Sequence, residues 1–184
     1  LGTTVPQPAF LYSSIENSVL PKTPFIIMEY IEGECLEELD KRDETLCPER
    51  TQVLGESLGR ALAAIHKVRF LQSGFLNERL VVDENPESQI AMNGRGLSQF
   101  AEKILIEDGA IERLGKGLTH RFLAYLEEEA EQLDTYKDLP CLCHGDFGSS
   151  NILVKDDRVT AVLDFEFAFS GLPFCDLGNL LRPP

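Results

Sequence analysis

The sequence predicts an α+β protein in which short strands occur near both ends of the chain and amphipathic helices lie between them. Three observations support this prediction. A β-prone run covers residues 25–30, apolar residues recur at helical spacing after Pro48, and the pattern becomes strand-like again after Pro140. Strands and helices that are segregated along a chain are typical of α+β folds.

The first 33 residues predict a two-stranded ribbon. Several prolines flank a short apolar run at 9–12, which fits one strand. The denser run 25–30 predicts the second strand. This second strand then opens into a linker that ends at Gly33.

The first long helix is predicted over 48–67. Pro48 suits the first helical position, and Glu49 places a carboxylate in the first turn. Apolar residues follow at the three- and four-residue spacing of a helix with one buried face. The stretch 74–96 is rich in Asn, Asp, Pro and Gly, so it predicts a loop with a short strand at 80–82.

Two further helices are predicted in the second half of the chain. Residues 97–114 have a weaker helical pattern, which Gly109 interrupts. Thr119 is the predicted N-cap of another helix, whose apolar positions continue to Leu133. Its acidic run is most simply a solvated face.

A β-hairpin is predicted after these helices, with strands at 152–154 and 160–163 and a turn at 155–158. Asn151 lies at the start of its first strand, and Asp164 lies at the end of its second. Because antiparallel pairing brings these two ends together, we expect the two side chains to be neighbours.

A third polar residue, Asp146, lies in a Gly- and Ser-rich loop five positions before Asn151. Carboxylate and amide oxygens are hard ligands that suit Mg²⁺, so Asn151 and Asp164 are candidate ligands. Asp146 is then available to accept the proton of an attacking hydroxyl, which is the division of labour that phosphoryl transfer requires. The simpler alternative is that Asp146 only caps a turn.

The net charge of the chain restricts the kinds of molecule that it is expected to bind. Its 184 residues include 17 basic and 31 acidic side chains, which gives a net charge of −14. This balance predicts no binding to nucleic acid, because neutralising phosphates needs clustered Lys and Arg. It suits a cationic small ligand, although solubility alone also explains such a balance.

Neither a membrane span nor a secretion signal is predicted. No apolar run approaches the roughly 20 residues that a bilayer span requires. The first eight residues lack the basic region and apolar stretch of a signal peptide. The scattered cysteines predict reduced thiols in a cytoplasmic protein, since the single C-x-C pair is poor zinc spacing. They are Cys35, Cys47, Cys141, Cys143 and Cys175.

A family resemblance rests on two segments around the hairpin. The first reads Cys143-His144-Gly145-Asp146-Phe147-Gly148-Ser149-Ser150-Asn151-Ile152-Leu153-Val154, and the second reads Val162-Leu163-Asp164-Phe165-Glu166. Together they resemble the catalytic and metal-binding loops of the aminoglycoside phosphotransferase and choline kinase family, relatives of protein kinases. Gly148 and Glu166 favour the small-molecule branch, because protein kinases usually have Lys and Gly there.

The resemblance extends to the second predicted strand. Residues 26–33 resemble the hinge that lines the adenine pocket, with Met28 at the gatekeeper position. By this resemblance the Glu29 carbonyl and the Ile31 amide bind the adenine edge. The resemblance also implies structural rather than chemical roles for three other residues, namely His66, His144 and Asp176.

The resemblance implies a protein-kinase-like fold with two parts. Residues 1–33 correspond to a remnant of the β-rich N-terminal lobe and the hinge. Residues 34–184 correspond to the mostly helical C-terminal lobe, which is expected to be incomplete at its C-terminus. The Gly-rich strand-turn-strand and the lysine that the family has before the hinge are missing. The G-x-G sequences at 94–96 and 115–117 do not complete a phosphate-binding motif and predict turns.

The activity implied by the resemblance is ATP- and Mg²⁺-dependent phosphorylation of a hydroxyl on a small molecule. Asp146 is the expected catalytic residue, and Asn151 and Asp164 are the expected Mg²⁺ ligands. An aminoglycoside-like antibiotic is the favoured acceptor, while choline, a sugar, a macrolide or homoserine are alternatives. A kinase-like binding module without catalysis is the alternative from another class. The oligomeric state is not predicted.

Overall fold

The computed structural model describes residues 5–15, 20, 23–41, 46–83, 94–107 and 109–182. The chain forms two compact units, each built from separate segments. The first unit contains Leu1–Ile65, Asp146–Glu166 and Asn179–Pro184, and the second contains His66–Gly145 and Phe167–Gly178. The predicted boundary at residue 33 between two lobes stays a prediction.

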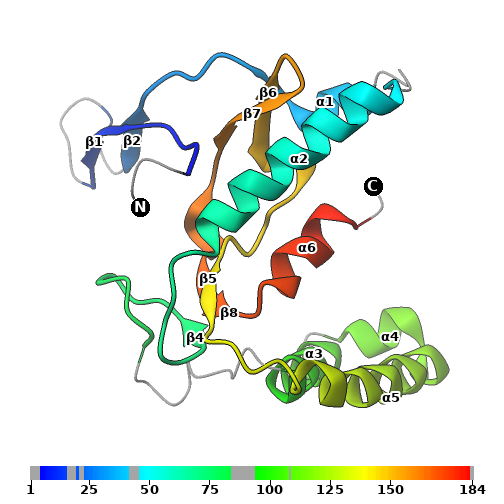
Figure 1. Cartoon of the computed structure of the whole chain (residues 1–184). Coiled ribbons are helices and arrows are strands. Elements are labelled where there is room, and N and C mark those ends of the chain that lie inside the picture. The colour runs from blue at the N-terminus through cyan, green and yellow to red at the C-terminus, as the bar shows by residue number, and fades with distance from the viewer. Residues whose placement is uncertain are drawn as a thin grey trace. The chain divides into compact units, whose positions relative to one another are not determined.

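Strands and helices follow one another in the order that the α+β prediction gives, with strands at both ends and the long helices between them (Figure 1). Their bounds are β1 (Phe10–Ser14), β2 (Phe25–Met28), β3 (Glu34–Cys35), α1 (Leu36–Lys41), α2 (Pro48–Ile65), β4 (Gly74–Phe75), α3 (Gly94–Glu107), α4 (Ala110–Leu114), α5 (Lys116–Leu133), β5 (Cys141–Cys143), η1 (Ser149–Asn151), β6 (Ile152–Lys155), β7 (Arg158–Val162), η2 (Phe165–Phe167), β8 (Phe169–Gly171) and α6 (Phe174–Leu180).

The first unit begins with the predicted two-stranded ribbon. Strands β1 and β2 pair antiparallel, and β2 ends at Met28, two residues before the predicted end of the strand. Most apolar side chains of the ribbon are exposed, so the described part of the chain covers neither face of it. The segment before the ribbon is anchored to strand β7, because the Val162 N–H donates to the Pro6 carbonyl at 2.7 Å.

The predicted hairpin is confirmed as strands β6 and β7. Strand β3 pairs with β6 on the side away from β7. Asp156 and Asp157 form the turn, and both have positive φ, 52° and 59°. Two left-handed residues make the kind of turn whose twist matches that of paired strands. Helix α2 lies beside β7 (Figure 1), and the predicted helix over 48–67 is confirmed with its end at Ile65.

The core of the first unit lies between α2 and the hairpin. The buried residues of α2 recur at helical spacing, and those of the hairpin alternate in β6 but are consecutive at the end of β7. They are Leu54, Ala61, Leu62, Ala64 and Ile65 in the helix, and Ile152, Val154, Ala161 and Val162 in the strands.

The second unit contains a small sheet with the order β4-β8-β5. Strand β8 lies in the middle and pairs antiparallel with both neighbours. The buried side chains of Cys141, Cys143 and Phe169 form its core, and partly buried apolar side chains pack against them. Sequence patterns did not predict these strands, which have only two or three residues each.

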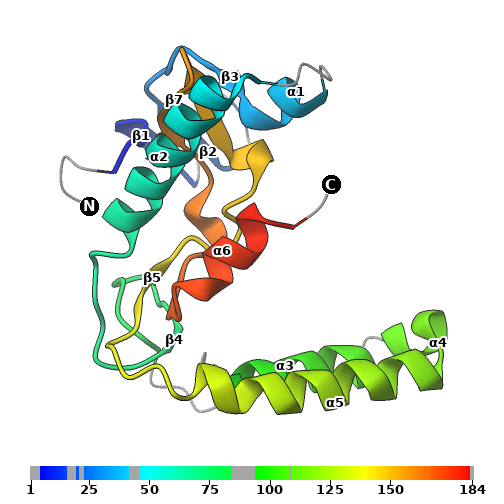
Figure 2. The same ribbon diagram turned by 45° about the vertical axis from the view of Figure 1, so that its right-hand side comes forward.

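Helices α3 and α5 form an antiparallel pair in the second unit, and both views place them side by side (Figures 1 and 2). Gly94 begins α3 against the backbone of Ala130 in α5, and its N–H donates to Asp134 Oδ1 at 2.9 Å. The predicted interruption at Gly109 is confirmed, because this residue has φ 67° and separates α3 from α4.

Two local predictions, at Thr119 and at residues 80–82, are wrong. Thr119 is not an N-cap but lies buried inside α5, where its Oγ1 donates to the Gly115 carbonyl at 3.1 Å. Gly115, with φ 79°, ends α4 and is followed directly by α5. The predicted strand at 80–82 is a turn, because Leu80 has φ 56° and only Val82 forms a bridge, to Leu76.

The G-x-G sequence at 94–96 forms the first turn of α3 rather than a loop turn. The rest of the predicted loop, at 84–93, lies outside the described residues. Within the described ranges, none of the helices combines the length and the apolar character needed to cross a bilayer.

Candidate active site

The loop that carries Asp146 follows strand β5 and is folded by its own backbone. The Gly148 N–H donates to the Asp146 carbonyl at 2.8 Å, and the Asn151 N–H donates to the Gly148 carbonyl at 3.0 Å. The short turn η1 then leads into β6. Phe147 is fully buried, so its side chain anchors the loop while the Asp146 side chain is only half-buried.

The Asn151 amide orients the Asp146 carboxylate. Its Nδ2 donates to the Asp146 carbonyl at 3.0 Å and to Asp146 Oδ2 at 2.9 Å. This double contact fixes both side chains, because Nδ2 uses its two hydrogens on one residue. Within the described residues, no donor reaches Asn151 Oδ1, so the oxygen of the amide is available to a ligand.

Asp164 lies next to Asn151, as the hairpin predicts. Ile152 pairs with Val162, and the Leu163 N–H donates to the Asn151 carbonyl at 2.8 Å, one residue before Asp164. Asp164 has φ 62°, a conformation that few non-glycine residues adopt. Its carboxylate is exposed, and among the described residues it has no hydrogen-bond or salt-bridge partner.

This set of donors fits Mg²⁺. The amide oxygen of Asn151 and the carboxylate of Asp164 are hard oxygen ligands with no competing partner in the described chain, and two protein ligands leave positions for water and phosphate. Asp146 is held instead by the Asn151 amide group, whose Nδ2 donates to its Oδ2.

The predicted hinge residues belong to the same unit but are not bonded to these three groups. The Glu29 N–H donates to the Ala9 carbonyl at 2.8 Å, and the Ala9 N–H donates to Glu29 Oε2 at 3.1 Å. The side chain of Met28 is 54% exposed. In the described part of the chain, neither the Glu29 carbonyl nor the Ile31 N–H takes part in a hydrogen bond, so both could meet an adenine edge.

A buried carboxylate in the second unit supports the start of the loop that carries Asp146. Asp176 accepts hydrogen bonds from the His144 N–H at 2.9 Å and from the Gly145 N–H at 3.0 Å. Its Oδ2 also lies 2.9 Å from His66 Nε2. Asp176 is fully buried and bonded to two backbone N–H groups at the start of the loop, as predicted. His144 is also fully buried, and its structural role stays a prediction.

The sequence pattern of the phosphotransferase enzyme family matches residues 1–183. The chain belongs to this family. The predicted family resemblance and the predicted kinase-like α+β fold are therefore confirmed.

Solved aminoglycoside phosphotransferases have the same fold. A thermostable mutant of the aminoglycoside phosphotransferase APH(4)-Ia, in a ternary complex with ADP and hygromycin B, superposes with a TM-score of 0.68 at 18% identity. The match covers 97% of this chain and 56% of that chain. The streptomycin–ATP–APH(2")-IIa ternary complex gives a TM-score of 0.54 at 25% identity, over 94% of this chain and 52% of that chain.

A curated relative is the rat (Rattus norvegicus) protein named acyl-CoA dehydrogenase family member 11. It is 27% identical over 193 residues, which cover 98% of this chain and 21% of the rat protein. The chain therefore spans about a fifth of this relative and just over half of the solved phosphotransferases.

One cluster in this family member was not recognised in the sequence. His66 lies beside Cys141 and Cys143, and the three ligand atoms are within 4.8 Å of one another. Strand alternation could have indicated that the two thiols share a face. No pattern along the chain relates them to His66, which comes 75 positions before Cys141.

Proposed function

We propose that this chain forms the catalytic core of an ATP-dependent phosphotransferase that acts on a hydroxyl of a small molecule. The observation that carries the proposal is the division of roles around Asn151. Its amide nitrogen orients Asp146, while its free amide oxygen lies on the same hairpin end as Asp164. The Asp146 carboxylate is thereby assigned to the acceptor hydroxyl and the Asp164 carboxylate to the metal ion.

In the proposed reaction Asp146 binds the acceptor hydroxyl and takes its proton. The hydroxyl oxygen forms a bond to the γ-phosphorus of ATP, and the bond from that phosphorus to the bridging oxygen of ADP breaks. Asn151 and Asp164 would hold Mg²⁺. When bound, the ion would offset the negative charge of the phosphate oxygens.

The hinge is the proposed adenine site. The Glu29 carbonyl would accept a hydrogen bond from the base, the Ile31 N–H would donate one, and Met28 would cover the ring. Support comes from the solved relatives, which include complexes named for ADP, AMP-PNP and ATP. The five free cysteines are consistent with a reducing, cytoplasmic location.

An aminoglycoside-like polycation is the favoured acceptor. The net charge of −14 suits such a ligand, and solved relatives are named as complexes with hygromycin B, streptomycin and gentamicin. A hydroxylated acyl-CoA is a second candidate, because the rat relative is named as an acyl-CoA dehydrogenase family member. Choline, simple sugars, macrolides and homoserine complete the set of acceptors to be tested.

The decisive experiment measures transfer of labelled γ-phosphate to this panel by the longest available version of the protein. We expect Asp146→Asn to reduce the rate by about 10²–10⁴-fold, as loss of a general base does, while Mg²⁺·ATP still raises the melting temperature. Asp156→Asn is the matched control. Asp156 is an exposed turn residue with φ 52°, a conformation that Asn tolerates, so this variant should retain full activity.

Two outcomes would contradict the proposal. Equal transfer by Asp146→Asn and the parent protein would show that Asp146 is not the base. Absence of both transfer and Mg²⁺-dependent ATP binding would favour a kinase-like binding module without catalysis. The metal assignment is tested separately, because Asn151→Ala and Asp164→Ala should each abolish the stabilisation that depends on Mg²⁺·ATP.

A further inference from the structure

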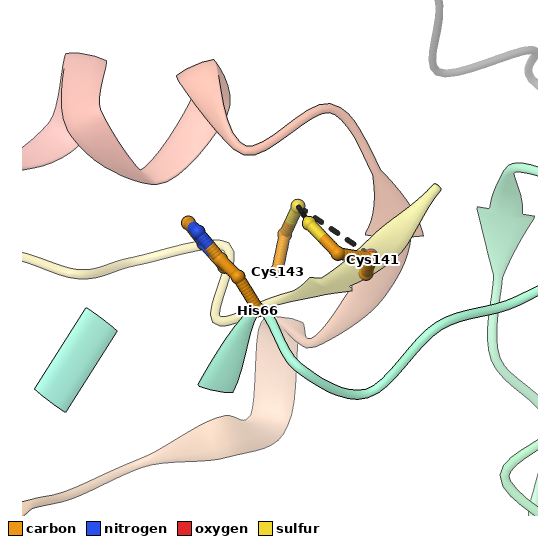
Figure 3. A group of neighbouring side chains, drawn as sticks. All are labelled: His66, Cys141 and Cys143. Carbon is orange, nitrogen blue, oxygen red and sulfur yellow. Dashed lines mark hydrogen bonds between the residues drawn. The ribbon is translucent and has the colours of Figure 1, made fainter. Parts of the chain in front are cut away.

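The second unit contains a group of nitrogen and sulfur ligands that the proposed reaction does not use. Cys141 and Cys143 are alternate residues of strand β5, so both side chains point to one face of the strand. Both are fully buried, and their Sγ atoms lie 4.0 Å apart. The imidazole of His66 lies beside the two sulfurs (Figure 3), and the three ligand atoms are within 4.8 Å of one another.

This spacing matches what a tetrahedral metal site needs. Zn–S bonds of about 2.3 Å at the tetrahedral angle place two sulfurs about 3.8 Å apart. The observed separation of 4.0 Å is therefore close to that of two sulfurs sharing one ion. The ligands differ from those around Asn151 and Asp164, because thiolate and imidazole select soft and borderline ions over Mg²⁺.

A neighbouring carboxylate holds the imidazole in place. Asp176 Oδ2 lies 2.9 Å from His66 Nε2, and both oxygens of Asp176 are fixed by backbone N–H groups. Carboxylates that orient a histidine are a regular part of protein metal sites. The His66 side chain is 12% exposed, so an ion could reach the cluster from solvent.

The protonation of the two thiols is already unequal. The hydrogen bond with Cys143 lowers the pKa of the Cys141 thiol to about 7, and the positive charge of Arg69 acts in the same direction. The same hydrogen bond and burial raise the pKa of Cys143. Each thiol also contacts a backbone carbonyl, Cys141 at Gly171 and Cys143 at Leu172. Metal binding would replace the protons of the two thiols.

We propose that His66, Cys141 and Cys143 form a binding site for a thiophilic divalent cation, with Zn²⁺ as the expected occupant. The site does not depend on the proposed transferase activity. It joins His66 to strand β5, whose last residue precedes Asp146 by three positions. Binding of the ion would therefore stabilise the strand from which the catalytic loop begins.

The first test is titration of the reduced, metal-free full chain with Co²⁺, followed by displacement with Zn²⁺. We expect one equivalent of Co²⁺ to give a thiolate charge-transfer band and the intense visible bands of a four-coordinate ion. Cys141→Ser should weaken Zn²⁺ binding by at least about 100-fold, since it removes a ligand. Cys47→Ser is the matched control, because Cys47 is exposed and lies outside the cluster, and it should bind Zn²⁺ like the parent protein.

The second test needs no substitution, so it covers the case in which Cys141→Ser fails to fold. The parent chain is loaded with ¹¹³Cd²⁺, and its NMR shift should report two thiolate ligands. A shift typical of oxygen ligands alone would overturn the proposal. So would a Co²⁺ spectrum without a thiolate band, or a thiolate band that is lost in Cys47→Ser and kept in Cys141→Ser.

Discussion

The fully buried Asp176 side chain accepts hydrogen bonds from two consecutive backbone N–H groups, at His144 and Gly145, and contacts His66. An amide in its place has only one oxygen, and its NH₂ group would face an N–H donor. We therefore expect Asp176→Asn to lower the free energy of unfolding by about 3 kcal/mol, the usual cost of breaking a buried charged network. Urea denaturation followed by circular dichroism would measure this loss.

Asp138→Asn is the control for this substitution, because Asp138 is exposed and the same chemical change there should alter stability by less than about 0.5 kcal/mol. Similar unfolding midpoints for the two variants would show that Asp176 does not hold the loop. The sequence and the family resemblance predicted this supporting role. They did not predict the contact of Asp176 with His66, which joins residues 110 positions apart.

At the scale of elements, the pair formed by α3 and α5 depends on one glycine. A Cβ at Gly94 would collide with the Ala130 backbone, which cannot move aside like the tip of a side chain. We expect Gly94→Ala to separate the helices and to destabilise the chain by about 1–3 kcal/mol. Gly117→Ala in α5 is the matched control, since a Cβ there meets nothing within 4 Å. Thermal unfolding that affects both variants equally would contradict this account.

The elements predicted from the sequence are those whose pattern is local. The hairpin of β6 and β7 has both of its strands and its turn within eleven residues, Ile152 to Val162, and α2 has its buried face within one helix. The neighbouring positions of Asn151 and Asp164 followed from that hairpin. Strand β8 is different, because it has three residues and its partner Cys141 lies 30 positions away. Such a strand exists only through its tertiary partners, which no local pattern records.

At the scale of the whole molecule, the net charge of −14 predicts how the acceptor binds. The attraction between an acidic protein and a polycation acts over about 8–10 Å at moderate salt, and added salt screens it. If the acceptor is a polycation, its KM should rise by about threefold or more between low ionic strength and 0.2 M salt. This prediction rests on the proposed function. The acceptor to be used is the one that receives labelled phosphate in the transfer assay.

The sign of the salt effect separates the two leading acceptor classes. A hydroxylated acyl-CoA is an anion that the chain repels, so screening should lower its KM rather than raise it. A neutral sugar should show almost no change and serves as the control for general effects of salt on the enzyme. Because ATP is also an anion, its own KM must be measured at each ionic strength, and its concentration must be kept saturating throughout. Initial rates over a series of NaCl concentrations give the answer, and a polycation whose KM does not respond to salt would show that the acidic charge lies away from the acceptor site.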